Sequence, residues 1–309
     1  MSRESKGAGL AEPPVESAGE TASAVDEAKR ERARESAEAP GRVSKHSVFR
    51  EYFESLVVTA VMALFGMTLV VQAVKVPTGS MQNTILIGDH LLVNKFIFAP
   101  GPHLFFLPQR DIRRGDVIVF KYPGKFQGEA RFRDSPDVDD TQPNNTPYKI
   151  NYVKRVIGLP GDVVEVKDTK VFINGQPLEE HVITALNSFD EHDTSGDESQ
   201  SPLVIKNDPP RASDETYDVY FDPSRHSVTR KADGKFIVPE GYYFAMGDNR
   251  DNSLDSRFWG YVPRSAIIGR AMFVYWSYDE SAPNAGGAFG FLIDFFSNTR
   301  WRRTGTLVK

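Results

Sequence analysis

One serine lies in a turn that could hold an acyl-transfer nucleophile. The segment Val76-Pro77-Thr78-Gly79-Ser80-Met81 places a glycine directly before Ser80. Glycine relieves crowding of the backbone, and the N–H groups beside it could bind an oxyanion. A Thr-Gly-Ser turn alone is weak evidence, and the G-x-S-x-G elbow of the α/β hydrolases is absent. Ser80 is therefore a candidate nucleophile that requires a base.

Histidine is a poor candidate for that base. The chain has six histidines, of which only His90 lies close to Ser80 in the sequence. Its neighbour Asp89 could not orient it, because adjacent side chains of a strand or helix point in different directions. We therefore expect catalysis without histidine. The absence of cysteine excludes thiol nucleophiles and disulfides.

A lysine is the alternative base. In a strand predicted over residues 151–157, Lys154 shares a face with Tyr152 and Val156. Apolar surroundings disfavour the ammonium form, and a free lysine has a pKa of about 10.4. A base acting near pH 7 needs a pKa lower by about three units, which corresponds to a preference of roughly 4 kcal/mol for the neutral amine. The strand alone leaves open whether Lys154 is this base or extends from a sheet edge into water.

A loop rich in Asp and Asn covers residues 247–257, and its composition suggests calcium. The EF-hand spacing fails, because the twelfth residue from Asp248 or Asp251 is Trp259 or Val262 instead of glutamate. We therefore expect no metal and no cofactor. Asp and Arg at this density favour a loop fixed by ion pairs and hydrogen bonds.

An uncharged segment precedes these residues and predicts a membrane anchor. Residues 55–74 form about 30 Å of helix at about 1.5 Å per residue, the thickness of a bilayer core. Arg42, Lys45 and Arg50 precede it and only Lys75 follows directly, which places the N-terminus in the cytoplasm. We expect a disordered cytoplasmic tail over 1–48, an anchor over 49–76 and an extracytoplasmic domain of a single-pass inner-membrane protein. Ser80 would then lie close to the outer membrane surface.

The remaining chain predicts a mainly β fold with an antiparallel sheet. Alternating or apolar runs bounded by turn residues mark the strands, and Asn174-Gly175 predicts a hairpin. The net charge, 37 − 42 = −5, argues against a nucleic-acid binder. We expect a catalytic β domain over 77–178 and 236–280, an inserted subdomain over 179–235 and a C-terminal tail over 281–309. The predicted strands cover residues 116–122, 151–157, 163–166, 170–173, 202–205, 217–221, 242–246 and 271–276.

The C-terminal tail combines aromatic and basic residues. Phenylalanines and aliphatic residues between 289 and 296 precede Arg300-Trp301-Arg302-Arg303. This composition suits a membrane interface. A helix packed on the domain is an equally good interpretation.

Together these segments resemble the type I signal peptidase family of membrane-bound Ser–Lys proteases. The resemblance covers roughly residues 55–278, and the anchor followed by four blocks in order makes chance similarity a poor explanation. The blocks are Pro77-Thr78-Gly79-Ser80-Met81, residues 114–120 (RGDVIVF), residues 152–162 (YVKRVIGLPGD), and residues 247–253 (GDNRDNS) with Asp255-Ser256-Arg257.

The resemblance implies a role for each matching residue. Ser80 is the nucleophile and Lys154 the general base, Thr78 and the Ser80 N–H form the oxyanion hole, and Ser253 orients the lysine. The bracing ion pairs are assigned to Arg155, Asp248, Asp255 and Arg257. The pockets for small substrate side chains are assigned to Val76, Pro77, Met81, Ile85, Tyr152 and Val153.

Two residues depart from the family pattern. Thr78 replaces the common serine but keeps a hydroxyl, and Asn83 replaces a common proline and can close the turn through its side chain.

The resemblance implies a monomeric endopeptidase that cleaves signal peptides from exported preproteins after Ala-x-Ala, with the preproteins and the lipid bilayer as partners. Two alternatives are a tethered, non-catalytic β domain and a self-cleaving Ser–Lys protein, for which Val71-Gln72-Ala73 offers a site.

Overall fold

The computed structural model describes residues 25–32, 45–99, 109–168, 170–186, 202–223, 233–283, 285–286 and 289–309. Its chain forms two compact units, Met1–Met62 and Ala63–Lys309. Residues 25–32 are helical, and α2 (Lys45–Phe65) begins inside the tail predicted to be disordered. The tail predicted over residues 1–48 thus contains helix at 25–32 and at 45–48. The rest of that tail, residues 1–24 and 33–44, lies outside the described residues.

The apolar segment is helical only up to residue 70. The π-helix η1 (Gly66–Val70) follows α2, and strand β1 (Val71–Lys75) begins at once. The predicted anchor helix is therefore wrong at its C-terminal end, because β1 forms an antiparallel pair with β2 (Asp89–Asn94). Among the residues that the structure describes, we find no helix with the length and apolar character that a membrane span requires.

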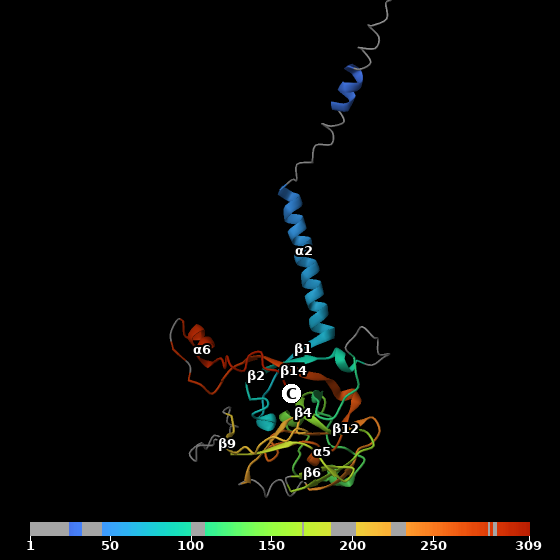
Figure 1. Ribbon diagram of the computed structural model, residues 1–309, viewed down its shortest axis with the longest axis vertical. Helices are drawn as coiled ribbons and strands as arrows, with labels where there is room; N and C mark the ends of the chain where they lie inside the picture. The colour runs from blue at the N-terminus through green and yellow to red at the C-terminus, as the bar shows by residue number, and fades with distance from the viewer. Residues whose placement is uncertain are drawn as a thin grey trace, which may run out of the picture. The chain divides into compact units, whose positions relative to one another are not determined.

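The centre of the second unit is a seven-stranded sheet in the order β1-β2-β14-β3-β4-β12-β13 (Figure 1). Every neighbouring pair in it is antiparallel, which confirms the predicted architecture. β4 is buried at six consecutive residues because it lies inside the sheet with both faces covered. The strands not yet given are β3 (Val117–Lys121), β4 (Asn151–Gly158), β12 (Tyr242–Met246), β13 (Val262–Pro263) and β14 (Ile267–Ser277).

A four-stranded sheet in the order β11-β5-β6-β7 packs against the first through an aromatic core. Asn174 and Gly175 have φ values of 53° and 84°, as a tight hairpin turn between β6 and β7 requires. Phe236 of β11 and Phe244 of β12 lie 4.7 Å apart between ring centroids and join the two sheets. The strands are β5 (Val163–Lys167), β6 (Lys170–Ile173), β7 (Gln176–Pro177) and β11 (Gly234–Ile237).

The predicted insertion contains a third sheet in the order β10-β8-β9. β8 (His181–Leu186) is antiparallel to β9 (Val204–Asn207) but parallel to β10 (Asp218–Phe221). The strands predicted over residues 202–205 and 217–221 therefore overlap β9 and β10. Within it, residues 187–201 and 224–232 lie outside the described residues.

Short helices connect the strands and position the loops of the domain. The 3₁₀ turn η2 (Gly79–Met81) follows β1, and α5 (Ser256–Trp259) ends the loop over residues 247–257. α6 (Gly290–Asn298) lies in the predicted C-terminal tail. The remaining short helices are η3 (Phe96–Phe98), α3 (Ala130–Arg133), η4 (Pro143–Asn145) and η7 (Arg264–Ala266).

Candidate active site

The turn after β1 holds Ser80 beside the central sheet. The Val76 N–H donates to the Asp89 carbonyl oxygen at 2.9 Å, and the Gly88 N–H donates to the Val76 carbonyl oxygen at 3.0 Å. These bonds extend the β1–β2 pairing to the residue before the turn. Val76 and Met81 then anchor the turn in an apolar core, which leaves Ser80 only 8% exposed. The turn residues 76–81 are called the nucleophile turn below.

Lys154 comes from the middle of β4 and meets Ser80. It pairs in register with Ile118 of β3 and is only 3% exposed. Its Nζ is hydrogen-bonded to the Ser80 Oγ, although 74 residues separate the two in the chain. The Tyr152 ring lies 5.5 Å from the same Nζ. The structure thus brings a hydroxyl and an amine into contact in a nearly dry site, as a Ser–Lys proton transfer requires.

A cavity of about 460 Å³ opens beside this pair. Five of the six predicted substrate-pocket residues line it, namely Val76, Pro77, Met81, Tyr152 and Val153. The sixth, Ile85, is fully buried in the apolar core that also contains Val76, Met81 and Val153, and it does not itself line the cavity, so its assignment to the pocket stays a prediction.

Several cavity residues were not predicted, and two of them come from a loop whose sequence has no strand or helix pattern. Asp137 and Asn145 both line the cavity. The Asn145 Oδ1 accepts a hydrogen bond from the Tyr152 hydroxyl at 2.8 Å, and the Tyr152 ring stacks on Tyr122. Loop and strand together therefore fix the Tyr152 side chain in the cavity wall.

Residues 247–257, called the Asp–Asn loop below, contain two buried ion pairs made by the predicted residues. The Arg155 Nε and Nη2 donate to the two Asp248 carboxylate oxygens at 2.8 and 2.7 Å. The Arg257 Nε and Nη2 donate to the two Asp255 oxygens at 2.8 Å each. Burial acts to raise the pKa of Asp255, but the Arg257 guanidinium and the Gly247 N–H hold that pKa below its ordinary value.

The remaining predicted residues border the same cavity. Thr78 is exposed at its wall, and its side chain makes no capping hydrogen bond to η2. Ser253 is 7% exposed and lines the cavity, but its buried Oγ makes no hydrogen bond to Lys154 or to any other described residue. The EF-hand reading was rejected on spacing, and the part of the chain that the structure describes contains no cluster of acidic and histidine side chains able to hold a metal.

Gly247 is a site residue that the sequence analysis did not single out. A Cβ at this position would lie 2.3 Å from the Ser253 Oγ and 2.4 Å from the Ser80 carbonyl oxygen. Only glycine lets the Asp–Asn loop approach the nucleophile turn this closely. The signal was present in the Gly-Asp-Asn sequence, but a close approach between segments cannot be read from one of them.

Comparisons with known proteins agree with this geometry. A family model described as "Signal peptidase, peptidase S26" matches residues 49–276, which include all of these site residues. The chain is 32% identical to signal peptidase I of Pseudomonas fluorescens over 260 residues, which is 77% of this chain and 76% of that protein. It is 35% identical to signal peptidase I of Aquifex aeolicus over 243 residues, or 72% of this chain and 81% of that protein. The chain therefore belongs to the signal peptidase I family of serine proteases, which use a Ser–Lys dyad.

Proposed function

We propose that this protein cleaves signal peptides from exported preproteins, with Ser80 as nucleophile and Lys154 as general base. The observation that carries the proposal is the buried hydrogen bond between the Ser80 Oγ and the Lys154 Nζ at the edge of the cavity. The family supplies the substrate class, since signal peptidases act on preproteins that carry a signal peptide.

Acyl transfer at this site proceeds in two stages. The neutral Lys154 amine accepts the Ser80 proton as the Ser80 oxygen attacks the scissile carbonyl carbon. The Ser80 N–H and the Thr78 hydroxyl donate to the oxyanion that forms. The Lys154 ammonium then gives its proton to the leaving amine. In the second stage Lys154 accepts a proton from water, whose oxygen attacks the acyl-enzyme carbonyl, and the Lys154 ammonium then returns that proton to the Ser80 oxygen as the acyl–oxygen bond breaks.

Other residues have supporting roles in this mechanism. The two buried ion pairs keep the Asp–Asn loop in one conformation. The role of orienting the lysine is assigned to Ser253 by the family resemblance alone, since its buried Oγ makes no hydrogen bond within the described residues. Val76, Met81 and Val153 supply apolar walls to the cavity, and the family resemblance supplies the expected cleavage after Ala-x-Ala, with small side chains next to the scissile bond.

We place this reaction at the outer face of the inner membrane, with the chain acting as a monomer. The family is membrane-associated, and the uncharged residues 55–70 directly precede β1 and the nucleophile turn. A scissile bond at the end of a membrane-embedded signal peptide would reach a site so placed.

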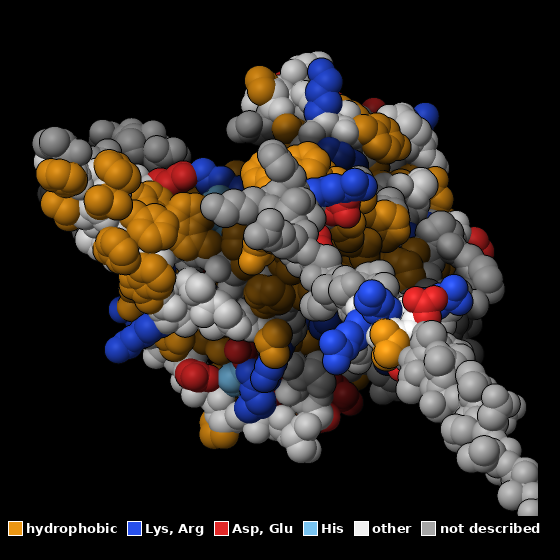
Figure 2. Space-filling view, turned by 90° about the horizontal axis from the view of Figure 1, so that it is seen from above, with side chains coloured by type: hydrophobic (Ala, Val, Ile, Leu, Met, Phe, Trp, Pro, Cys, Tyr) orange, Lys and Arg blue, Asp and Glu red, His pale blue; other side chains and the backbone are white. Residues whose placement is uncertain are grey.

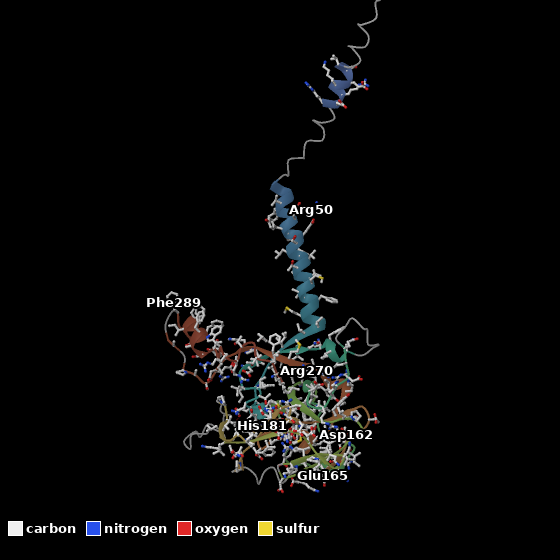
Figure 3. All side chains as sticks on the ribbon, in the orientation of Figure 1. Arg50, Asp162, Glu165, His181, Arg270 and Phe289 are labelled. Carbon is white, nitrogen blue, oxygen red and sulfur yellow. The ribbon has the colours of Figure 1, made fainter. Side chains whose placement is uncertain are left out.

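α6 supplies a second proposed contact with lipid. Its aromatic and aliphatic side chains are exposed, including Phe291 at 70% and Phe296 at 62%, and Phe289 before it also faces outward (Figure 3). Figure 2 shows hydrophobic side chains gathered at the left of that view, the side on which Figure 1 places α6. The exposed Trp301 and Arg302 follow the helix, a combination suited to the level of lipid headgroups.

The experiment is cleavage of a model preprotein in detergent by the wild type, Ser80→Ala and Lys154→Ala. We expect both variants to lose processing by at least about 10³-fold, because each removes one partner of the proton transfer. His181→Asn is the matched control and should retain cleavage, since no step uses histidine. Full activity of Lys154→Ala would contradict the mechanism, and an inactive wild type would favour the non-catalytic β domain.

A further inference from the structure

The sheet of the insertion contacts the catalytic machinery directly. The inserted lobe is defined here as β8, β9 and β10 with the adjoining residues Glu180, Leu203, Tyr217 and Asp222. In β10, the Tyr220 N–H donates to the Asp248 carbonyl oxygen at 2.8 Å, and the Tyr220 carbonyl accepts from the Arg250 N–H at 2.9 Å. The Asp–Asn loop thus pairs with β10 through a parallel bridge between Tyr220 and Asn249.

A buried ion pair reinforces this backbone contact. Glu180 and Arg250 meet through both carboxylate oxygens and both terminal guanidinium nitrogens, with the Nη1–Oε1 distance at 2.7 Å. Their side chains are only 3% and 1% exposed. The Tyr217 ring lies 4.2 Å from the guanidinium carbon of Arg155, the partner of Asp248. Lobe residues therefore neutralise or cover two of the buried cations around the site.

Asn249 transmits this contact to the nucleophile. Its backbone N–H donates to the Ser80 carbonyl oxygen at 3.1 Å, and its side-chain Nδ2 donates to the Gly79 carbonyl oxygen at 3.1 Å. One residue of the Asp–Asn loop therefore bridges β10 on one side and the nucleophile turn on the other.

A second link reaches the segment after Ser80 without passing through the Asp–Asn loop. The Leu203 N–H donates to the Asn83 Oδ1 at 2.7 Å, and the Asn83 Nδ2 donates to the Leu203 carbonyl oxygen at 3.4 Å. The Asn83 side-chain amide thus bonds to both backbone groups of Leu203, as a paired strand residue would. Asn83 has a φ of 75°, which asparagine tolerates better than most residues.

From these contacts we propose that the inserted lobe positions the nucleophile, with Glu180 and Asn83 as the positioning residues. Glu180 holds the Asp–Asn loop through Arg250, and Asn83 holds the chain three residues beyond Ser80. The lobe thereby sets the distance between the Ser80 oxygen and the Lys154 amine that proton transfer needs. This inference rests on the proposed function, since it assigns the lobe a role in that same reaction.

The test compares kcat and KM for a short soluble peptide with an Ala-x-Ala site. Asn83→Gly removes the amide but keeps a backbone that accepts positive φ, and we expect kcat to fall about 10- to 100-fold with KM within about threefold. Asn83→Asp keeps the acceptor for the Leu203 N–H and should recover part of the loss. Glu180→Gln should lower kcat in the same way.

The control is Asp218→Asn, which removes an ion pair of the same lobe with His181 and Arg211. It should lower the thermal midpoint without lowering kcat. An Asn83→Gly protein with unchanged kcat, or an Asp218→Asn protein with kcat lowered as much, would show that the lobe only stabilises the fold and would overturn the proposal.

Amide exchange gives a readout that does not depend on activity. Asn83→Gly and Glu180→Gln should speed exchange in residues 79–83 and 247–252 and leave β3 unchanged. Failure of the wild type to cleave any substrate would refute the proposed function, whereas unchanged exchange in both variants would refute the positioning role alone.

Discussion

Lys154 and Arg155 are adjacent in β4, and their side chains leave the strand on opposite faces. Lys154 contacts the Ser80 Oγ, whereas Arg155 forms a two-pronged ion pair with Asp248 of the Asp–Asn loop. Because a strand alternates its side chains, one short segment supplies the candidate base to the cavity and a structural cation to the loop behind it. A slip of the β4 register by one residue would turn each side chain to the opposite face, so that Lys154 would point away from the cavity.

Removing one partner of the buried Arg155–Asp248 pair should destabilise the protein strongly. Asp248→Asn leaves the Arg155 charge buried and unmatched, so we expect the free energy of unfolding to fall by about 3 to 5 kcal/mol. Chemical denaturation of both proteins at pH 7 measures the change. Replacing both residues with apolar ones of similar size should lower the free energy of unfolding by less than Asp248→Asn does. An equal loss would show that the unpaired charge does not cause the destabilisation.

Gly247 should tolerate no side chain. In Gly247→Ala the new Cβ meets the Ser253 oxygen and the Ser80 carbonyl, which forces the Asp–Asn loop away from the nucleophile turn. We expect kcat to fall about 100-fold or more, since displacement of a reacting group by about 1 Å can have that effect. Peptide cleavage measures it, with Gly286→Ala as control because nothing lies within 4 Å of that position. Equal activity of the two variants would refute the close approach.

Asp255 should make stability depend on pH in the acid range. Its pKa is lower in the folded protein than its ordinary value of 3.8, so its contribution is present above about pH 4 and is lost as the pH falls through the folded value. The difference in unfolding free energy between the wild type and Asp255→Asn should therefore be largest near neutral pH and shrink below about pH 4. Denaturant titrations from pH 7 to pH 3 test this. A difference that grows on acidification would mean that the pKa is raised.

The lipid contact of α6 can be tested because the chain has no cysteine. A single cysteine introduced as Phe291→Cys can carry an environment-sensitive fluorophore, and Ile237→Cys in β11 is the control with similar exposure, 63% against 70%. With full-length protein in anionic vesicles, we expect a blue shift and quenching by lipid-borne nitroxides at 291 but not at 237. Identical spectra at the two sites would favour a helix that lies in water.

Much of the fold could be predicted from local pattern. Strands β6 and β12 have the predicted bounds, and β3, β4 and β5 differ by one residue at one or both ends, because alternation and turn residues are local signals. The helix predicted through residue 74 was wrong beyond residue 70, since the uncharged residues 71–74 are compatible with either a helix or a strand. Their pairing with β2, which no local pattern records, decided in favour of a strand.

The candidate site residues could also be identified from the sequence. They are a serine in a tight turn, a lysine on an apolar strand and a loop with both acidic and basic residues. Local pattern identified these groups because each depends on residue type and on the order of neighbouring residues. Tertiary structure alone decided that Glu180 pairs with Arg250 and that Gly247 approaches the nucleophile turn. Those relationships join segments tens to more than a hundred residues apart. Their distances depend on how the sheets pack, and packing is a property of the whole domain.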